Sequence, residues 1–271
     1  MLDGCQAAQD LRQLAGSELA GSAGAVAELG QPAVGCGGSH RSDSTGGVGD
    51  AGWRVERAVG SAAAFHARPL ARPVSRTVSV LEVDRPALVL GSTQPDTDAH
   101  AAAVAAGGVE LVRRRSGGGA VLLVGGQSLW VDVVVPRGDR LWDDDVHRAS
   151  RWLATAWVAA LGGLGVVAEA HTGPLVTTRW SRLVCFAGLG PGEVRTGGRK
   201  LVGVSQRRTR HGARFQCLVL RRWEPQPLLD LLALDAAERR QAAAELVSVA
   251  TGLHQPFPPL VAAFLSHLPQ P

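Results

Sequence analysis

The sequence contains no asparagine, isoleucine or tyrosine, and its 271 residues include one methionine and one lysine, Lys200. These residue types share AT-rich codons, so we expect a GC-rich bacterial genome. The 27 other basic residues are arginine. Lysine therefore persists at one position where coding bias has otherwise replaced it. Chance retention is the alternative, but the pattern favours a role for a compact ammonium, which a planar guanidinium cannot imitate.

Segments that would direct the chain out of the cytoplasm are also missing. No uninterrupted apolar run approaches the roughly 20 residues of a membrane span, and the N-terminus lacks the basic and apolar regions of a secretory signal. Four cysteines in a chain of this length do not form a disulfide scaffold. We therefore expect a cytoplasmic protein with no membrane partner. Because 45% of the residues are hydrophobic, disorder throughout is excluded.

The first 52 residues differ in composition from the rest. They hold 12 of the 34 glycines, 2 basic and 6 acidic residues, and no aromatic residue. Such a segment offers little apolar surface to bury. It predicts a disordered Gly/Ala/Ser-rich leader over 1–52 and a globular domain over 53–271. A start codon assigned too early and a functional tail are the alternatives.

Short apolar stretches separated by glycine and proline dominate the globular part. We expect strands over 76–83, 87–90, 109–114, 120–124, 128–135, 166–170, 183–186, 194–195, 200–207 and 213–220. We expect helices over 98–106, 143–161, 228–234, 235–251 and 258–268. Strands and helices do not alternate regularly, which favours an α+β single domain with a mostly antiparallel or mixed sheet flanked by helices.

Two glycine-containing motifs are candidates for chemistry. The first, RRRSGGGAV at 113–121, combines glycines that let a ligand approach the backbone with arginines that grip phosphate or carboxylate. It matches neither a Walker loop nor a dinucleotide fingerprint, and a solvated hairpin with a basic flank is the alternative.

The second motif is GRKLVGVSQRR at 198–208, and the Gly-Gly pair within residues 196–199 predicts a tight hairpin at its start. Strand alternation predicts that Lys200, Val202 and Val204 share one face. A lysine on the inner side of a sheet must meet an anion or a carbonyl. The alternative is an edge lysine that reaches solvent just after a turn.

Cys185 lies 15 residues before Lys200. Buried cysteines are usually inert small hydrophobes, but an ammonium brought close to this thiol would favour a nucleophilic thiolate. Cys217 lies in an apolar strand and is expected to be core, and Cys5 and Cys36 lie in the leader. No cysteine and histidine spacing suggests a metal site, so none is expected.

The two motifs, about 80 residues apart, resemble the lipoate–protein ligase family, part of the wider biotin/lipoyl protein ligase fold. The resemblance covers about 53–234. It implies a catalytic domain related to class II aminoacyl-tRNA synthetases and biotinyl protein ligases. It also implies transfer of a lipoyl or octanoyl group to one lysine of a lipoyl carrier domain.

The same resemblance implies site residues and partners. Lys200 would contact the reacting carbonyl and phosphate. The acyl or acyl-adenylate site would comprise Arg114, Arg115, Ser116, Gly117, Gly118, Gly119, Ala120, Gly203 and Ser205. The implied carrier is a glycine cleavage H protein or a 2-oxoacid dehydrogenase E2 type, with an acyl carrier protein as a further candidate partner.

The basic run Arg207, Arg208 and Arg210 at a predicted hairpin turn is a candidate docking surface for an acidic carrier domain. A solvated loop is the alternative. Aromatic residues are only 4% and do not interleave with the run, so we do not expect a nucleic-acid partner.

The sequence departs from the ligase pattern in three places. Leu122 and Leu123 stand where ligases have an aromatic–histidine pair. The Cys185-Phe186 stretch is more similar to octanoyltransferases and amidotransferases of the same fold, in which the cysteine accepts the acyl group. Only about 35 residues follow Leu234, too few for the accessory domain of two-domain ligases.

Two enzymatic mechanisms and one non-enzymatic role therefore remain open. A transferase would pass the acyl group through a Cys185 thioester without a cofactor. A ligase would activate lipoate or octanoate with ATP and Mg before transfer. An inactive relative would only bind carrier domains or acyl groups, but retention of Arg114 and Arg115, the three glycines and Lys200 argues against it.

Removal of residues 1–52 is expected to leave the melting temperature and acyl transfer nearly unchanged, because this segment offers little apolar surface to bury. Thermal unfolding of the truncated and full chains tests this. A loss of more than about 1 kcal/mol, typical of a core lesion, would instead show that the leader docks on the domain.

Overall fold

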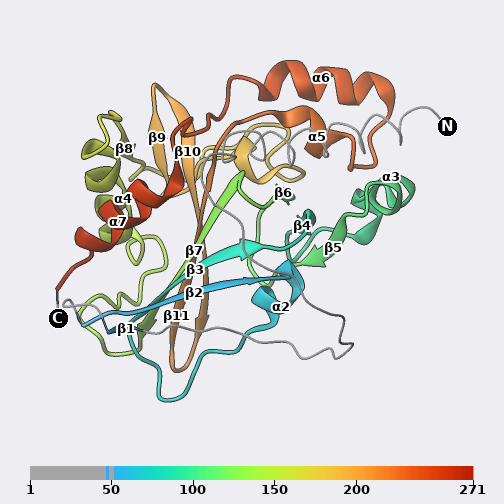
Figure 1. The fold of residues 1–271 in the computed structure, drawn as a ribbon. Coiled ribbons are helices and arrows are strands. Elements are labelled where there is room, and N and C mark those ends of the chain that lie inside the picture. The colour runs from blue at the N-terminus through green and yellow to red at the C-terminus, as the bar shows by residue number, and fades with distance from the viewer. Residues whose placement is uncertain (1–46, 49–51, 271) are drawn as a thin grey trace, which may run out of the picture.

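The computed structural model describes residues 47–48 and 52–270. The strands of this part of the chain form two sheets (Figure 1). The larger sheet has the order β1 (Gly47–Val48), β2 (Arg54–Gly60), β3 (Thr77–Val83), β7 (Ser128–Pro136), β11 (Gly212–Leu220), β10 (Arg199–Thr209), β9 (Val194–Thr196), β8 (Glu169–Ala170). The smaller has the order β5 (Glu110–Arg113), β4 (Ala87–Leu90), β6 (Val121–Leu123). The β2–β3 and β4–β5 pairs are parallel and the other pairs antiparallel, so the expected mixed sheet is confirmed.

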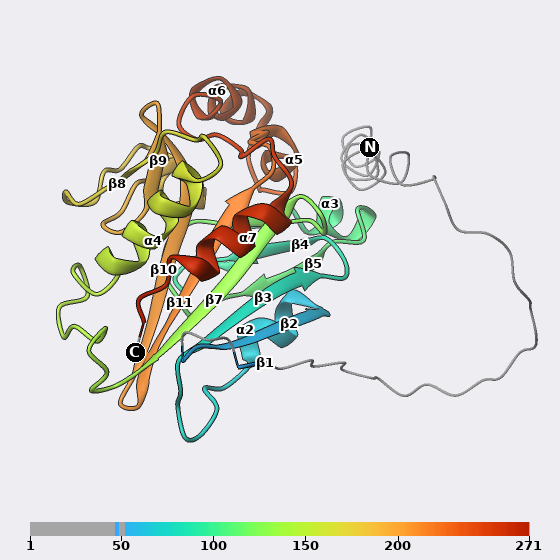
Figure 2. The ribbon, with the colours of Figure 1, turned by 60° about the vertical axis from the view of Figure 1, so that its left-hand side comes forward.

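Two helices cover one face of the larger sheet, and a short helix and the smaller sheet pack on the other face. The helices are α2 (Ala62–Ala67), α3 (Ala101–Ala106), α4 (Arg151–Gly162), α5 (Pro225–Leu229), α6 (Ala236–Leu246) and α7 (Phe257–Ser266), and the 3-10 turns are η1 (Asp96–Asp98) and η2 (Cys185–Ala187). Helices α4 and α7 lie across one face of the sheet (Figure 2). Trp157 of α4 stacks on Phe264 of α7 with 4.0 Å between ring centroids.

Strand alternation divides side chains between these two faces. Alternate residues of β7, from Leu129 to Val135, belong to the core beneath α4 and α7. Trp130, between them in sequence, packs instead with α2 and the small sheet. Because successive side chains of a strand point to opposite faces, β7 is buried on both sides. The second face carries the candidate site.

Several predicted elements differ from the structure in type or extent, three of them near the site or at the end of the chain. The helix expected over 143–161 begins only at Arg151, because Asp143 and Asp145 pair with Arg148 in a series of turns instead of entering the first helical turn. The strand expected over 183–186 does not form: Val184 makes one isolated bridge with Ala120, and the 3-10 turn η2 begins at Cys185. The helix expected over 235–251 is shorter: it begins at a capping box formed by Asp235 and Glu238 and ends at Leu246.

The expected leader lies outside the described residues except at 47–48 and 52, where Gly47 and Val48 pair antiparallel with β2. In the described part of the chain, no helix combines the length and apolar character needed to cross a membrane.

The hairpin expected at residues 196–199 is confirmed between β9 and β10. Gly197 and Gly198 have φ values of +53° and +77°, the left-handed conformation that a two-residue turn with the twist of a sheet requires. The turn ends two residues before Lys200 and so starts β10 at the candidate site.

Candidate functional site

A cavity of about 800 Å³ lies on the second face of the larger sheet, under the small sheet and the segment before β9. Its apolar wall comprises Val89, Val121, Leu123, Trp130, Phe186 and Leu218. Both glycine motifs and Cys185 also reach it. A largely apolar cavity with a few converging polar groups is the usual form of a small-molecule site.

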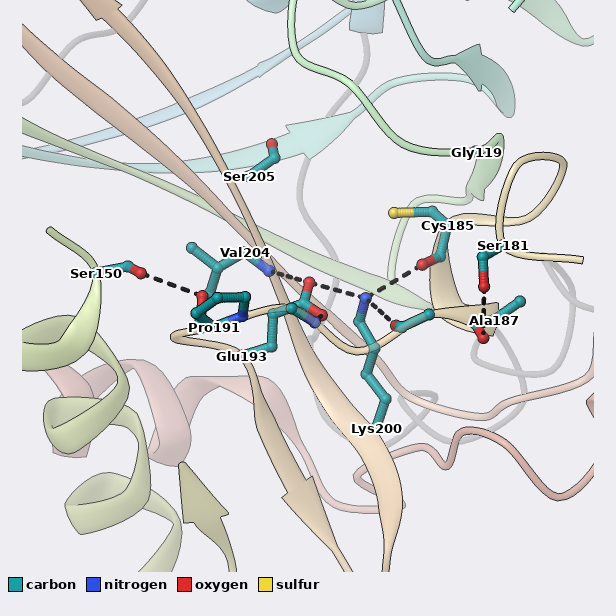
Figure 3. A network of polar contacts seen from close by, with 12 residues as sticks. Gly119, Ser150, Ser181, Cys185, Ala187, Pro191, Glu193, Lys200, Val204 and Ser205 are labelled. Atoms are coloured by element: carbon teal, nitrogen blue, oxygen red, sulfur yellow. Dashed lines mark hydrogen bonds and ion pairs between the residues drawn. The ribbon is translucent and has the colours of Figure 1, made fainter. Parts of the chain in front are cut away.

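Lys200 is the most enclosed charge of this site, with 3% of its side chain exposed. Its Nζ donates to the carbonyl oxygens of Cys185 at 3.1 Å and Gly188 at 3.0 Å, and pairs with Glu193 Oε1 at 2.8 Å (Figure 3). These contacts confirm that the lysine faces inward and meets both an anion and carbonyls. An ammonium has three N–H donors, and all three have protein acceptors here.

A bulge at the start of β10 determines which residues accompany Lys200. The register with β9 shifts between Lys200 and Val202. Leu201 and Val202 both belong to the core under α4 and α7, whereas a Cβ at Gly203 would lie 3.3 Å from the Lys200 side chain. The prediction that Val202 shares the face of Lys200 is therefore wrong, because a bulge breaks simple alternation.

Glu193 belongs to the site, although it is not among the residues predicted from the sequence. Beyond its ion pair with Lys200, its carboxylate accepts hydrogen bonds from the backbone N–H groups of Gly190 at 2.7 Å and Val204 at 3.0 Å. It is the only acidic residue between Glu169 and Glu224. That isolation was an available signal, since a buried lysine requires a nearby anion.

Cys185 is half-buried and lines the cavity. The contact from Lys200 reaches the carbonyl oxygen of Cys185 and not its sulfur (Figure 3). The charge beside the sulfur is the guanidinium of Arg114, with Nη2 at 3.7 Å from Sγ. The structure thus brings Cys185 and Lys200 together as expected, but the thiol lies next to a different cation.

The glycine-rich loop is folded around the Arg114 side chain. Arg114 Nη2 donates to the carbonyls of Gly117 at 2.9 Å and Gly119 at 2.8 Å. A Cβ at Gly119 would lie 2.4 Å from the backbone nitrogen of Val184, so this glycine permits the loop to touch the segment that carries Cys185. The Ala120 carbonyl accepts from Cys185 N at 2.9 Å and completes that contact.

The structure divides the remaining residues implied by the resemblance into three groups. Those that line the cavity with Cys185 and Lys200 are Arg114, Gly117, Gly118, Gly203 and Ser205. Those buried behind its wall are Ser116, Gly119 and Ala120. Arg115 is exposed and lines a separate, smaller cavity together with Arg207.

The expected docking arginines have different surroundings. Arg208 lies over the ring of Trp142 at 4.2 Å and donates to the Asp144 carbonyl at 2.8 Å. Arg210 is exposed and contacts His211. Carrier docking by Arg207, Arg208 and Arg210 stays a prediction.

His66 of α2 reaches the cavity, although no sequence pattern points to this residue. Its ring lies 4.6 Å from that of Trp130. Burial, together with the charges of Arg114 and Arg214, lowers the pKa of His66 to about 4, so the imidazole is neutral at pH 7. The cavity therefore has a histidine from a different element, although Leu122 and Leu123 replace the expected aromatic–histidine pair.

Two further buried groups have displaced pKa values. Burial raises the pKa of Asp132 to about 6, although Arg214 and the indole of Trp130 favour its charged form. Burial raises the pKa of Cys217 to about 12, in agreement with its expected place in the core. Within residues 52–270, no group of three or more potential ligands has the arrangement of a metal site.

The chain matches one protein-family model. The model for the lipoyl protein ligase A/B catalytic domain matches residues 63–265, which include both glycine motifs, Cys185 and Glu193. None of the curated proteins matches the chain.

Solved structures of lipoate ligases share the fold. A bipartite lipoate protein ligase from Thermoplasma acidophilum, described with its E2 lipoyl domain, has a TM-score of 0.58 and 17% identity over 72% of this chain and 70% of that chain. A putative lipoate protein ligase from T. acidophilum with bound lipoic acid has a TM-score of 0.57 and 14% identity over 79% and 83%. Lipoate-protein ligase A bound with ATP has a TM-score of 0.54 and 16% identity over 72% of each chain.

The contact between the glycine loop and Val184 predicts unequal effects of two alanine substitutions. Gly119→Ala is expected to destabilise the fold by about 1–3 kcal/mol, the usual range for overpacking, because its Cβ meets backbone that cannot move aside alone. Gly117→Ala is the matched control, since its Cβ would have no atom within 4 Å. Denaturant unfolding measures both, and equal stabilities would contradict the close contact.

Proposed function

The chain belongs to the lipoyl protein ligase A/B catalytic domain family, and we propose that it transfers an octanoyl or lipoyl group through a Cys185 thioester to a specific lysine of a lipoyl carrier domain. The observation that carries the proposal is a half-buried thiol on the wall of a mostly apolar cavity, 3.7 Å from a guanidinium nitrogen. A cationic neighbour and partial exposure are the usual surroundings of a nucleophilic cysteine.

The cavity wall suits a medium-length acyl chain. Phe186, adjacent to Cys185, packs against Trp223 with 5.6 Å between ring centroids and presents an apolar surface to the cavity. Leu123 and Leu218 extend this surface. An acyl chain among these residues is removed from water, which contributes about 0.8 kcal/mol for each buried CH₂ group.

In the first step, the Cys185 thiolate attacks the carbonyl carbon of an acyl thioester donor. A new C–S bond to Cys185 forms as the bond to the donor sulfur breaks, and the donor leaves as a thiol after taking one proton. Arg114 lies beside Sγ, where its positive charge faces the attacking sulfur. The buried Lys200 ammonium, 3.1 Å from the Cys185 carbonyl, holds the nucleophile's backbone in place.

In the second step, the neutral amine of the carrier lysine attacks the Cys185 thioester. An amide forms, the C–S bond breaks, and one proton of the amine passes to the Cys185 sulfur, which regenerates the thiol. Lys200 can act on the developing oxyanion only if one of its three donors exchanges a protein acceptor for the substrate oxygen. The Gly188 carbonyl lies in a glycine-rich segment with little side-chain hindrance, so it is the acceptor that we expect to be released.

An ATP-dependent lipoate ligase is the second candidate. The fold shared with a ligase bound with ATP favours it. In that route, free lipoate or octanoate and ATP give an acyl-adenylate and pyrophosphate, and attack by the carrier lysine releases AMP. Arg114 and Lys200 would hold the phosphate, and Cys185 would have no chemical role.

Lys200→Arg is expected to fold but to lose roughly 100-fold or more of its acyl transfer, the scale of losing one electrostatic contact in a transition state. A planar guanidinium cannot make the same three contacts from a buried position built for an ammonium. Turnover is measured with a lipoyl carrier domain, and thermal unfolding is the control for folding. Wild-type turnover would remove Lys200 from the mechanism.

Cys185 separates the two candidates. With an octanoyl thioester and no ATP, the transferase is expected to gain an acyl mass on Cys185 that hydroxylamine removes, because thioesters yield to that nucleophile and amides do not. Intact-protein and peptide mass spectrometry detect it.

Two variants control this experiment. Cys185→Ser is expected to lose the thioester and most transfer, whereas Cys217→Ala keeps both because Cys217 is 1% exposed. If Cys185→Ser transfers acyl groups at the wild-type rate, and pyrophosphate is released with ATP and lipoate, the ligase route replaces the proposal.

A further inference from the structure

A second cavity, of about 210 Å³, lies beside the β10–β11 hairpin and has a strongly basic wall. Arg207 and Arg214 come from the paired strands of the hairpin, Arg115 comes from the glycine-rich loop, and Arg72 comes from the segment after α2. That segment runs next to the hairpin tip (Figure 1). Since a liquid water occupies about 30 Å³, the space is sufficient for a phosphate group.

The positive charges of this wall are not balanced by acidic side chains. Within residues 52–270, the side chains of Arg72, Arg115 and Arg207 form no hydrogen bond or ion pair. Only Arg214 has a carboxylate near it, Asp132, with 3.6 Å between Nε and Oδ2. One carboxylate therefore lies beside one of the four guanidinium groups.

These charges repel one another. The pKa of Arg214 is lowered, first by burial and then by the charges of Arg68, Arg207 and Arg115, although Asp132 opposes the shift. Arg68 has its own partner, Glu56, at 3.0 Å. An anion in the cavity would relieve this repulsion, because close like charges in a partly desolvated site are unfavourable.

The hydrogen bonds of Arg214 are incomplete. Its Nη2 donates to the Pro69 carbonyl at 3.1 Å, whereas its buried Nε has no hydrogen-bond partner and lies 3.6 Å from Asp132 Oδ2. Guanidinium groups bind phosphate oxygens in pairs of parallel hydrogen bonds, so the arginines suit a phosphate better than a single carboxylate.

The second cavity continues the first along one face of β10. Gly203 and Ser205 line the large cavity, and Arg207, two residues further on, lines the small one. The paired strand β11 is divided in the same way. Gln216, opposite Ser205, lines the large cavity, and Arg214, opposite Arg207, lines the small one. At about 3.3 Å per residue, Arg207 lies about 23 Å along the strand from Lys200.

We propose that this basic cavity binds a phosphate group, and that the group belongs to an acyl donor that carries its phosphate on a long arm and whose acyl end occupies the large cavity. The first half of the proposal rests on the cavity alone, and the second half rests on the proposed function. A phosphate on a flexible arm attached to an acyl thioester and the phosphates of a nucleotide offer the same oxygen atoms to the arginines.

The test measures binding of inorganic phosphate, coenzyme A and ATP by calorimetry at constant ionic strength, without any acyl transfer. Arg115→Gln/Arg207→Gln is expected to weaken binding at least tenfold. The control, Arg57→Gln/Arg240→Gln, removes the same net charge from two exposed arginines and is expected to bind like wild type. Arg72→Gln, from a different segment, is expected to weaken binding as well.

The outcomes separate this site from the proposed function. Weakening for coenzyme A supports a phosphate on the donor's arm, and weakening for ATP alone overturns that source in favour of a separate nucleotide. Equal affinities in all variants overturn the proposal. The proposal is also overturned if these variants bind phosphate like wild type but lose binding to an acidic carrier domain. That result would assign the arginines to docking of carboxylates. Failure of Cys185 to form a thioester leaves these measurements unchanged and counts only against the transferase.

Discussion

The buried pair of Lys200 and Glu193 is the interaction on which the site depends. An isolated ammonium inside a protein is unfavourable by several kcal/mol, so Lys200 is stable at 3% exposure only because a carboxylate and two carbonyls meet it. Those acceptors come from residues 185–193. The same electrostatic requirement therefore ties the segment that carries the candidate nucleophile to β10, and the Glu193 contacts to Gly190 and Val204 fix the carboxylate in turn.

Close backbone approach is the second constraint. The glycine loop wraps around the Arg114 guanidinium and touches the chain at Val184 at a distance that excludes a Cβ at Gly119. Arg114 therefore has two roles at once. Its hydrogen bonds shape the loop, and its Nη2 atom lies 3.7 Å from the Cys185 sulfur. A fixed guanidinium suits both roles because its donors are planar and diverge.

The β10–β11 hairpin joins an apolar cavity to a basic one. Along one face, Gly203 and Ser205 give way to Arg207, and Leu218 and Gln216 give way to Arg214. A ligand that occupies both cavities must be apolar at the end beside Leu218 and anionic at the end beside Arg214, since apolar and anionic groups favour opposite surroundings. An acyl chain with a distant phosphate has that character.

The sequence by itself determined the mixed α+β class, the strands around both glycine motifs, the β9–β10 hairpin and the inward position of Lys200. These follow from local patterns of alternation, glycine placement and the charge of a lone lysine. Only the tertiary structure decided that Glu193 neutralises Lys200, that Arg114 lies beside Cys185, and that His66 reaches the cavity from α2. Local sequence patterns also could not predict the bulge after Lys200 or the 3-10 turn at Cys185, because each depends on contacts with residues distant in the sequence.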